Sequence, residues 1–282
     1  RSRSLPQSPQ LFQQLLMGVG FDKYYQLARC FRDEDLRGDR QPEFTQIDME
    51  TSFLDEKGVQ DYTEGLLKKI MKDVMGIDLK TPIARMSWND SMNKYGTDKP
   101  DTRYGMLIHD LSPIFKDSDF RVFSGAIADG GYVKGIAVKN GAKAYSRKKL
   151  DKKQDYIKRY HAKGLAWVKY EDGDFSGPVA RFLTDEDKEA LKKEFNLEGG
   201  ELVVFVADKW KVCCDSLNHL RREFAKETDI IPKHVFDFVW VVDWPLFEYD
   251  EGRGRWVAAH HPFTMPDDEG IKLLDTDPHK AH

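Results

Sequence analysis

The feature that most constrains the fold is a pair of alternating segments, residues 24–32 and 44–53. In each segment polar and apolar side chains take turns, and this period of two is typical of β-strands whose faces meet different surroundings. The residues between the segments are mostly charged and include Gly38 and Pro42, which favours a long polar loop. The sequence therefore predicts two strands of one sheet joined by that loop.

The two faces of this strand pair differ in chemistry. One face of the second strand is polar and carries two carboxylates and an amide: Phe44, Gln46, Asp48, Glu50 and Ser52. The other face is more apolar, and we expect it to lie on a core: Thr45, Ile47, Met49, Thr51 and Phe53. The first strand has a matching set with two small members that leave room above the sheet: Gln26, Ala28, Cys30 and Arg32. A solvated sheet surface would alternate in the same way, so patterning alone leaves a structural and a functional interpretation open.

Helical and strand patterns surround this pair. Ser8 and Pro9 are expected to start a helix as its N-cap and first residue, and residues 59–74 form an amphipathic pattern that ends at Gly76. Thr184 opens a later helix with a capping-box pattern. Further strands are predicted over 201–207, 235–242, 247–249 and 255–258, with a helix running to about residue 227 after the first of them. This mixture predicts an α+β fold.

Composition limits the class of protein. The 282 residues suggest about two domains, and no apolar run reaches the roughly 18–20 residues of a membrane helix. The cysteines number three with no C-x-x-C pair, so we expect neither a disulfide framework nor a zinc site, and a reducing cytosol fits. Residues 134–169 hold twelve Lys or Arg and two acids, a local charge of +10 in a chain of net charge −4. This basic stretch suggests a polyanionic partner, with a solvated lysine-rich surface as the alternative.

The sequences of four segments resemble those of one protein family. The strand pair and its loop read FRDEDLRGDRQPEFTQIDME over residues 31–50 and resemble motif 2 of class II aminoacyl-tRNA synthetases, in the form found in bacterial-type aspartyl enzymes. Three more segments match that family in the same order: LPQSPQLF at 5–12, YGTDKPDTRY at 95–104 and RWVAAHHPFT at 255–264. The resemblance covers essentially the whole chain.

The resemblance implies an architecture and an activity. The expected fold is a class II synthetase-like antiparallel sheet with flanking helices, in which residues 1–105 and 232–282 form the catalytic domain and 106–231 an inserted α/β domain. The implied reaction is aspartate activation with ATP to aspartyl-adenylate, followed by transfer to tRNA. ATP, Mg²⁺, tRNA and L-aspartate are the implied ligands, with a homodimeric, cytoplasmic enzyme that has no membrane contact.

The resemblance also assigns the ATP contacts. Arg32 is expected to bind the α-phosphate and the substrate carboxylate as the catalytic residue, because a planar guanidinium suits two phosphoryl oxygens at once. Glu34 and Gln41 match further ATP contacts, and Phe44 matches the aromatic ring on which adenine stacks. The chemistry itself needs positioning and charge stabilisation rather than a protein nucleophile.

The amino-acid pocket is assigned in the same way. Its expected members are Ser8, Gln10, Gln13, Arg32, Asp48, His260 and His261. Asp48 would pair with the substrate ammonium. The family carries a lysine that helps to read the substrate's side-chain carboxylate where this chain has Gln13. From sequence alone we expect that restoring the lysine raises selectivity for aspartate over asparagine.

Several segments of the family's pattern are not present. The anticodon-binding domain, motif 1, the metal-binding acids and motif 3 have no counterpart, so we interpret the chain as part of a longer enzyme with no metal site within it. Two alternatives stay open: a non-discriminating enzyme that also charges asparagine tRNA, and a catalytically incomplete tRNA-binding paralogue. A metal-dependent hydrolase built on His260, His261 and Asp243 lacks the ligand spacing for such a site.

Overall fold

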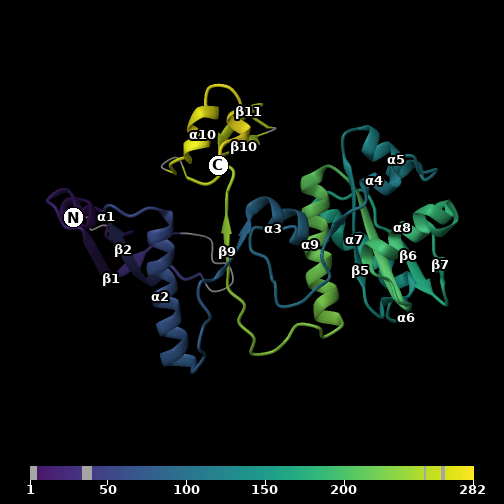
Figure 1. Ribbon diagram of the computed structural model, residues 1–282, viewed down its shortest axis with the longest axis horizontal. Helices are drawn as coiled ribbons and strands as arrows, with labels where there is room; N and C mark the ends of the chain where they lie inside the picture. The colour runs from purple at the N-terminus through teal and green to yellow at the C-terminus, as the bar shows by residue number, and fades with distance from the viewer. Residues whose placement is uncertain (1–4, 34–39, 251, 262–263) are drawn as a thin grey trace. The chain divides into compact units, whose positions relative to one another are not determined.

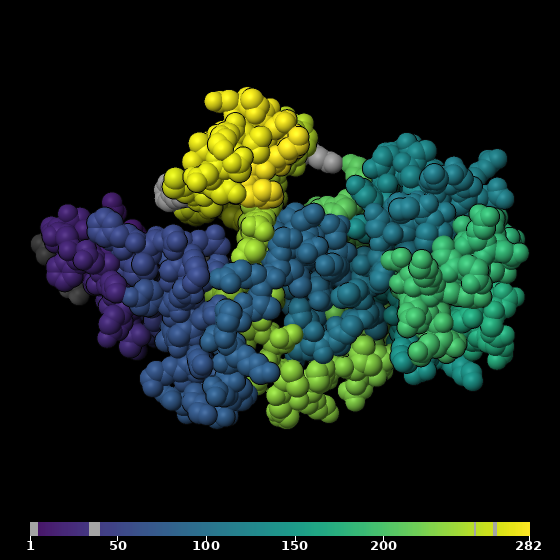
Figure 2. Space-filling model, in the orientation of Figure 1, coloured from purple at the N-terminus to yellow at the C-terminus, as the bar shows by residue number. Residues whose placement is uncertain are grey.

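The structure is a computed structural model that describes residues 5–33, 40–250, 252–261 and 264–282. The chain forms two compact units, Arg1–Ile83 and Ala84–His282, which are described separately. Figure 1 traces the chain, and Figure 2 shows all atoms in the same colours, the first unit in purple and blue. The predicted ATP contact Glu34 lies outside the described residues.

The first unit consists of two helices and an antiparallel strand pair. Its elements in chain order are α1 (Gln10–Gly18), β1 (Lys23–Phe31), β2 (Glu43–Thr51) and α2 (Glu56–Met75). β1 and β2 pair antiparallel along their full length, as the period of two predicted. The α2 helix is capped at both ends by local signals, because Asp55 accepts a hydrogen bond from the Gly58 amide at 2.7 Å and Gly76 takes the left-handed conformation.

The start of α1 differs slightly from the prediction. Pro9 is the N-cap residue and the helix begins at Gln10, with no side-chain cap from Ser8. The helix thus begins one residue later than predicted. Gln13 lies in its first turn and is the residue of α1 that the fold buries, with 3% of its surface exposed.

The prediction about the two faces of the strand pair was wrong in one respect. The expected core face is exposed, with 54% of Ile47 and 48% of Met49 accessible, and Leu27 on the neighbouring strand is 67% exposed. The buried side is the polar face, where Ala28 and Cys30 retain 7% and 0% of their surface. The reason is that α1 packs on that face, and the two small side chains let a helix approach the sheet closely.

The second unit contains a five-stranded antiparallel sheet. Its strand order is β4-β5-β8-β6-β7, and every neighbouring pair is antiparallel. The strands are β4 (His109–Asp110), β5 (Tyr132–Val138), β6 (Ala166–Glu171), β7 (Asp174–Ser176) and β8 (Glu201–Asp208). The central strand β8 is almost continuously apolar and buried on both faces, as expected for a sheet covered on both sides.

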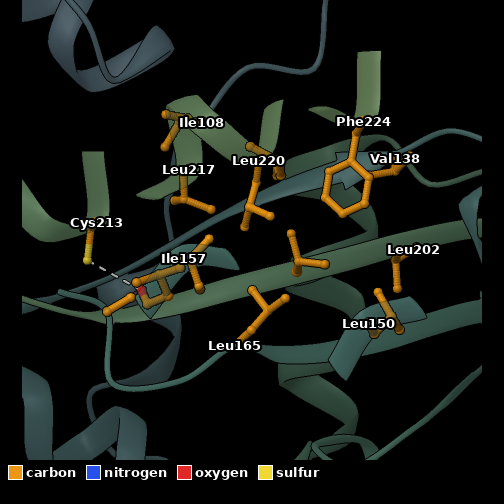
Figure 3. Close-up of a cluster of buried hydrophobic side chains, with 14 of the residues drawn as sticks. Ile108, Val138, Leu150, Ile157, Leu165, Leu202, Cys213, Leu217, Leu220 and Phe224 are labelled. Atoms are coloured by element: carbon orange, nitrogen blue, oxygen red, sulfur yellow. Dashed lines mark hydrogen bonds between the residues drawn. The ribbon is translucent and has the colours of Figure 1, made fainter. Parts of the chain in front are cut away.

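Helices cover both faces of this sheet (Figure 1). One core joins the sheet to α7 (Arg147–Ile157) and α9 (Trp210–Glu227), and Figure 3 shows its side chains, including Leu150, Leu202 and Phe224. The other core joins it to three helices: α4 (Ser112–Phe115), α5 (Arg121–Ala128) and α8 (Asp185–Phe195). The predicted capping box of Thr184 and Asp187 is present at the start of α8.

The remaining elements of the second unit are small. They are β3 (Ala84–Ser87), α3 (Trp88–Tyr95), α6 (Gly141–Ala144), β9 (Val239–Val242), β10 (Phe247–Asp250), β11 (Arg255–Ala258) and α10 (Asp268–Leu273), with single 3-10 turns at Lys158–Tyr160, Ala180–Phe182 and Pro278–Lys280. β9 pairs parallel with β3, and the two predicted strands β10 and β11 pair antiparallel. The strand predicted from residue 235 starts at Val239 and is half-buried rather than buried. Val235 and Phe236 lie before the strand and are 44% and 49% exposed.

A buried arginine ties α9 to the segment that precedes the five-stranded sheet. Arg221 is 1% exposed, and its guanidinium donates to the backbone carbonyls of residues 101, 104, 105 and 106 at 2.9–3.0 Å. The rings of Tyr95 and Tyr104 lie 4.9 and 4.0 Å from its Cζ. This buried cation is therefore satisfied by carbonyl oxygens and aromatic faces.

Within the described part of the chain, no helix has both the length and the apolar character needed to cross a lipid bilayer.

Candidate functional site

The half-buried polar face of the first unit centres on Asp48. The side-chain amide of Gln13 donates to Asp48 Oδ1 at 3.2 Å, and that of Gln46 donates to Asp48 Oδ2 at 3.1 Å. Gln26 lies directly opposite Asp48 in the β1–β2 register and accepts a hydrogen bond from the Tyr24 hydroxyl at 2.5 Å. The carboxylate is thus surrounded by neutral polar side chains, which lower the cost of burying its charge without cancelling it.

A cation and an aromatic ring lie at the loop end of the same face. The Arg32 guanidinium stands 5.1 Å from the centre of the Phe44 ring, and the Arg32 amide donates to the Pro42 carbonyl at 2.9 Å. Phe44 pairs with Cys30 in the register, on the same side of the sheet as Asp48. A flat guanidinium next to an aromatic face is an arrangement that suits a phosphate joined to a planar base.

The other predicted residues of the first unit lie on its surface. Ser8, Gln10 and Gln41 are exposed. Gln10 precedes Gln13 by three residues on α1, so the two side chains leave the helix on neighbouring positions of one side. The structure therefore brings Gln13 and Asp48 into contact, brings Arg32 next to Phe44, and leaves the remaining three open to solvent.

His260 and His261 belong to the second unit. The His260 ring packs edge-on against the Trp244 ring at 4.5 Å, and both histidines are exposed. His260 also lines a cavity of about 480 Å³, together with Thr97 and Asp98. Two of the segments quoted in the sequence analysis therefore meet at one cavity of this unit.

The structure revises the account of the basic stretch. Lys153 is buried, and its ammonium lies 2.6 Å from Glu227 Oε1 and 3.5 Å from Glu223 Oε2. Lys134 is 2% exposed and donates to Asn93 Oδ1 at 2.8 Å. These two lysines are internal and are not available to a polyanion. Four exposed side chains on and near the start of α7 form what we call the basic face: Arg147, Lys148, Lys149 and Lys152.

Sequence reasoning missed the contact between Gln46 and Asp48. A usable signal existed, because the period of two already placed Gln46 next to Asp48 on the polar face. The contact between Gln13 and Asp48 had no such signal, since the two residues lie 35 positions apart and meet only when α1 packs on the sheet.

Within the described ranges, no group of three or more His, Cys, Asp or Glu side chains could hold a metal ion. We assign no step of the chemistry to Mg²⁺, whose use stays an expectation from the resemblance.

The comparisons define first the class of protein. A model of the class II tRNA synthetases (D, K and N) matches residues 2–281, so the chain belongs to this family, as its motifs predicted. Its mixed α+β architecture, with antiparallel sheets and helices, is consistent with a class II catalytic domain.

The similar proteins narrow the class. The chain is 89% identical over 279 residues to the aspartate–tRNA ligase of Lactobacillus acidophilus. The matched residues make up 99% of this chain and 45% of that protein. It is 57% identical over 281 residues to the enzyme of the same name from Limosilactobacillus fermentum, covering 99% of this chain and 47% of the relative. It is also 53% identical over 275 residues to the aspartate–tRNA ligase of Bacillus licheniformis, covering 98% of this chain and 46% of the relative. The chain thus spans about half the length of the curated relatives it matches.

Proposed function

We propose that the protein containing this chain is an aspartate–tRNA ligase that activates aspartate with ATP and transfers it to tRNA. The family match and the 89% identity to a relative of that name support the proposal. The observation that carries it is the polar face of the first unit, where a carboxylate, a guanidinium and an aromatic ring share one side of a sheet. Mg²⁺ use, a homodimer, the inserted domain over 106–231 and a cytoplasmic location follow from the resemblance and belong to the same proposal.

In the proposed first step, a carboxylate oxygen of aspartate attacks the α-phosphorus of ATP and pyrophosphate leaves. Asp48 holds the substrate ammonium, and Arg32 stabilises the negative charge that grows on the α-phosphoryl oxygens. Phe44 provides a face for adenine, and its ring already lies 5.1 Å from Arg32 Cζ. These contacts orient two bound substrates for direct reaction, which is the main source of rate in a transfer without a protein nucleophile.

The experiment is aspartate-dependent exchange of pyrophosphate into ATP by the full-length protein. Arg32→Ala is expected to abolish exchange, because it removes the charge that faces the reacting phosphate. The matched control is Arg29→Ala, three residues earlier on β1, whose exposed side chain pairs with Glu43 at 3.3 Å on the opposite face. Retention of most activity by Arg32→Ala, or equal losses in both variants, would remove Arg32 from the reaction.

For tRNA we propose that the basic face contributes to binding. Its four side chains are exposed on one short segment, whereas Lys153 of the same helix is held by two glutamates. Neutralising the exposed members should weaken tRNA binding and reduce its salt dependence, since each released phosphate contact lowers the slope. If the dependence of log K on log salt does not change, this segment is an ordinary solvated surface and does not bind tRNA.

A further inference from the structure

The α1 helix has an unusual pattern of burial. Leu11, Phe12 and Leu15 are 68%, 67% and 59% exposed, while the polar Gln13 is 3% exposed. An amide loses hydration when it is buried, so this placement is stable only if the side chain makes good hydrogen bonds inside. The bond that the structure shows runs from Gln13 Nε2 to Asp48 Oδ1 at 3.2 Å.

Asp48 receives a second neutral donor on its other oxygen. Gln46 Nε2 donates to Asp48 Oδ2 at 3.1 Å. The opposite end of that amide, Gln46 Oε1, accepts from the Cys30 thiol, with the sulfur at 3.7 Å and fully buried. The same thiol also lies 3.7 Å from the Ala28 carbonyl oxygen, so its contact with Gln46 is a weak one.

The two amides hold the carboxylate without neutralising it. Each carboxylate oxygen can accept about two hydrogen bonds, so one amide on each oxygen leaves an acceptor position for a cationic donor. A carboxylate that is fixed in direction and keeps its charge is suited to bind an ammonium group. Gln13 and Gln46 therefore share one physical task.

We propose that Gln13 is a positioning residue that orients Asp48 toward the substrate ammonium. This inference rests on the proposed function, because it concerns the amino-acid pocket of that reaction.

The test measures binding of two ligands to the full-length protein by titration calorimetry: L-aspartate, and succinate, which lacks the ammonium group. Gln13→Leu removes the hydrogen bond at similar volume and should weaken aspartate binding about tenfold, the effect of one bond to a charged group, while succinate binding stays within about twofold. The matched control is Gln14→Leu, the exposed neighbour on α1, which should change neither.

Equal weakening of aspartate and succinate binding by Gln13→Leu, or no weakening of either, would overturn the inference. Failure of the parent protein to bind aspartate at all would instead refute the proposed function, and the inference with it.

Discussion

Replacing Arg221 with methionine should destabilise the second unit strongly. The Arg221 Nε atom has one hydrogen and donates to Met106 at 3.0 Å, while Nη2 has two hydrogens that are shared by the carbonyls of residues 101, 104 and 105. The side chain therefore makes about three full hydrogen bonds, each worth about 1.5–3 kcal/mol with a charged donor. Desolvation of the guanidinium, which also lowers the pKa of Arg221, offsets part of this, so we expect a net loss of about 4 kcal/mol.

The assay is equilibrium unfolding of the full-length protein, combined with hydrogen exchange. The Ile108 amide, which donates to the Lys94 carbonyl at 2.9 Å beside the anchored segment, should lose protection first. The control is Arg222→Met, the exposed neighbour on α9, with an expected change below about 0.5 kcal/mol. A loss below about 1 kcal/mol in Arg221→Met, or equal losses in both variants, would refute the argument that the carbonyl contacts stabilise this region.

Three further predictions concern the basic face, Glu227 and Gly96. Replacing Lys148, Lys149 and Lys152 of the basic face with glutamine should reduce the magnitude of the slope of log K for tRNA against log salt by about 2, measured by filter binding. Burial would raise the pKa of Glu227, but hydrogen bonds from Lys153 and Tyr145 hold that pKa below its ordinary value, so its stabilising contribution is present above the unfolded-state pKa and is lost as the pH falls through the folded-state pKa. Glu227→Gln should flatten that part of an acid-unfolding curve. Gly96→Ala should destabilise the unit by more than about 1 kcal/mol in urea unfolding, because the new Cβ would meet the Cys214 carbonyl oxygen at 2.2 Å and Gly96 has a φ of +72°.

Features set by local chemistry could be predicted from the sequence. The period of two placed Asp48 and Phe44 on one face, and the register confirms it. The capping box at Thr184 and the end of α2 at Gly76 also follow from side chains within a few residues of each other. In these cases the interaction partners are neighbours in the chain, so a pattern is enough.

Features that depend on packing between distant segments could not be predicted from the sequence. The alternation of residues 44–53 distinguishes two faces but does not say which one a helix covers, and α1 covers the polar one. Lys153 looks like its exposed neighbours in sequence, yet it is buried because Glu227, 74 residues away, lies on the adjacent helix.

The most direct test of the proposed aspartate activation is pyrophosphate exchange by the full-length protein with each amino acid supplied singly. The family includes enzymes for three amino acids, D, K and N, so the amino acid that stimulates exchange identifies the reaction. Asp48 and Arg32 would contact groups that all three amino acids or ATP supply, so the preference rests on the 89% identity to an aspartate–tRNA ligase, which predicts exchange with aspartate and at most background exchange with asparagine or lysine. Exchange that asparagine or lysine stimulates better than aspartate, or the absence of exchange with all three, would contradict the account.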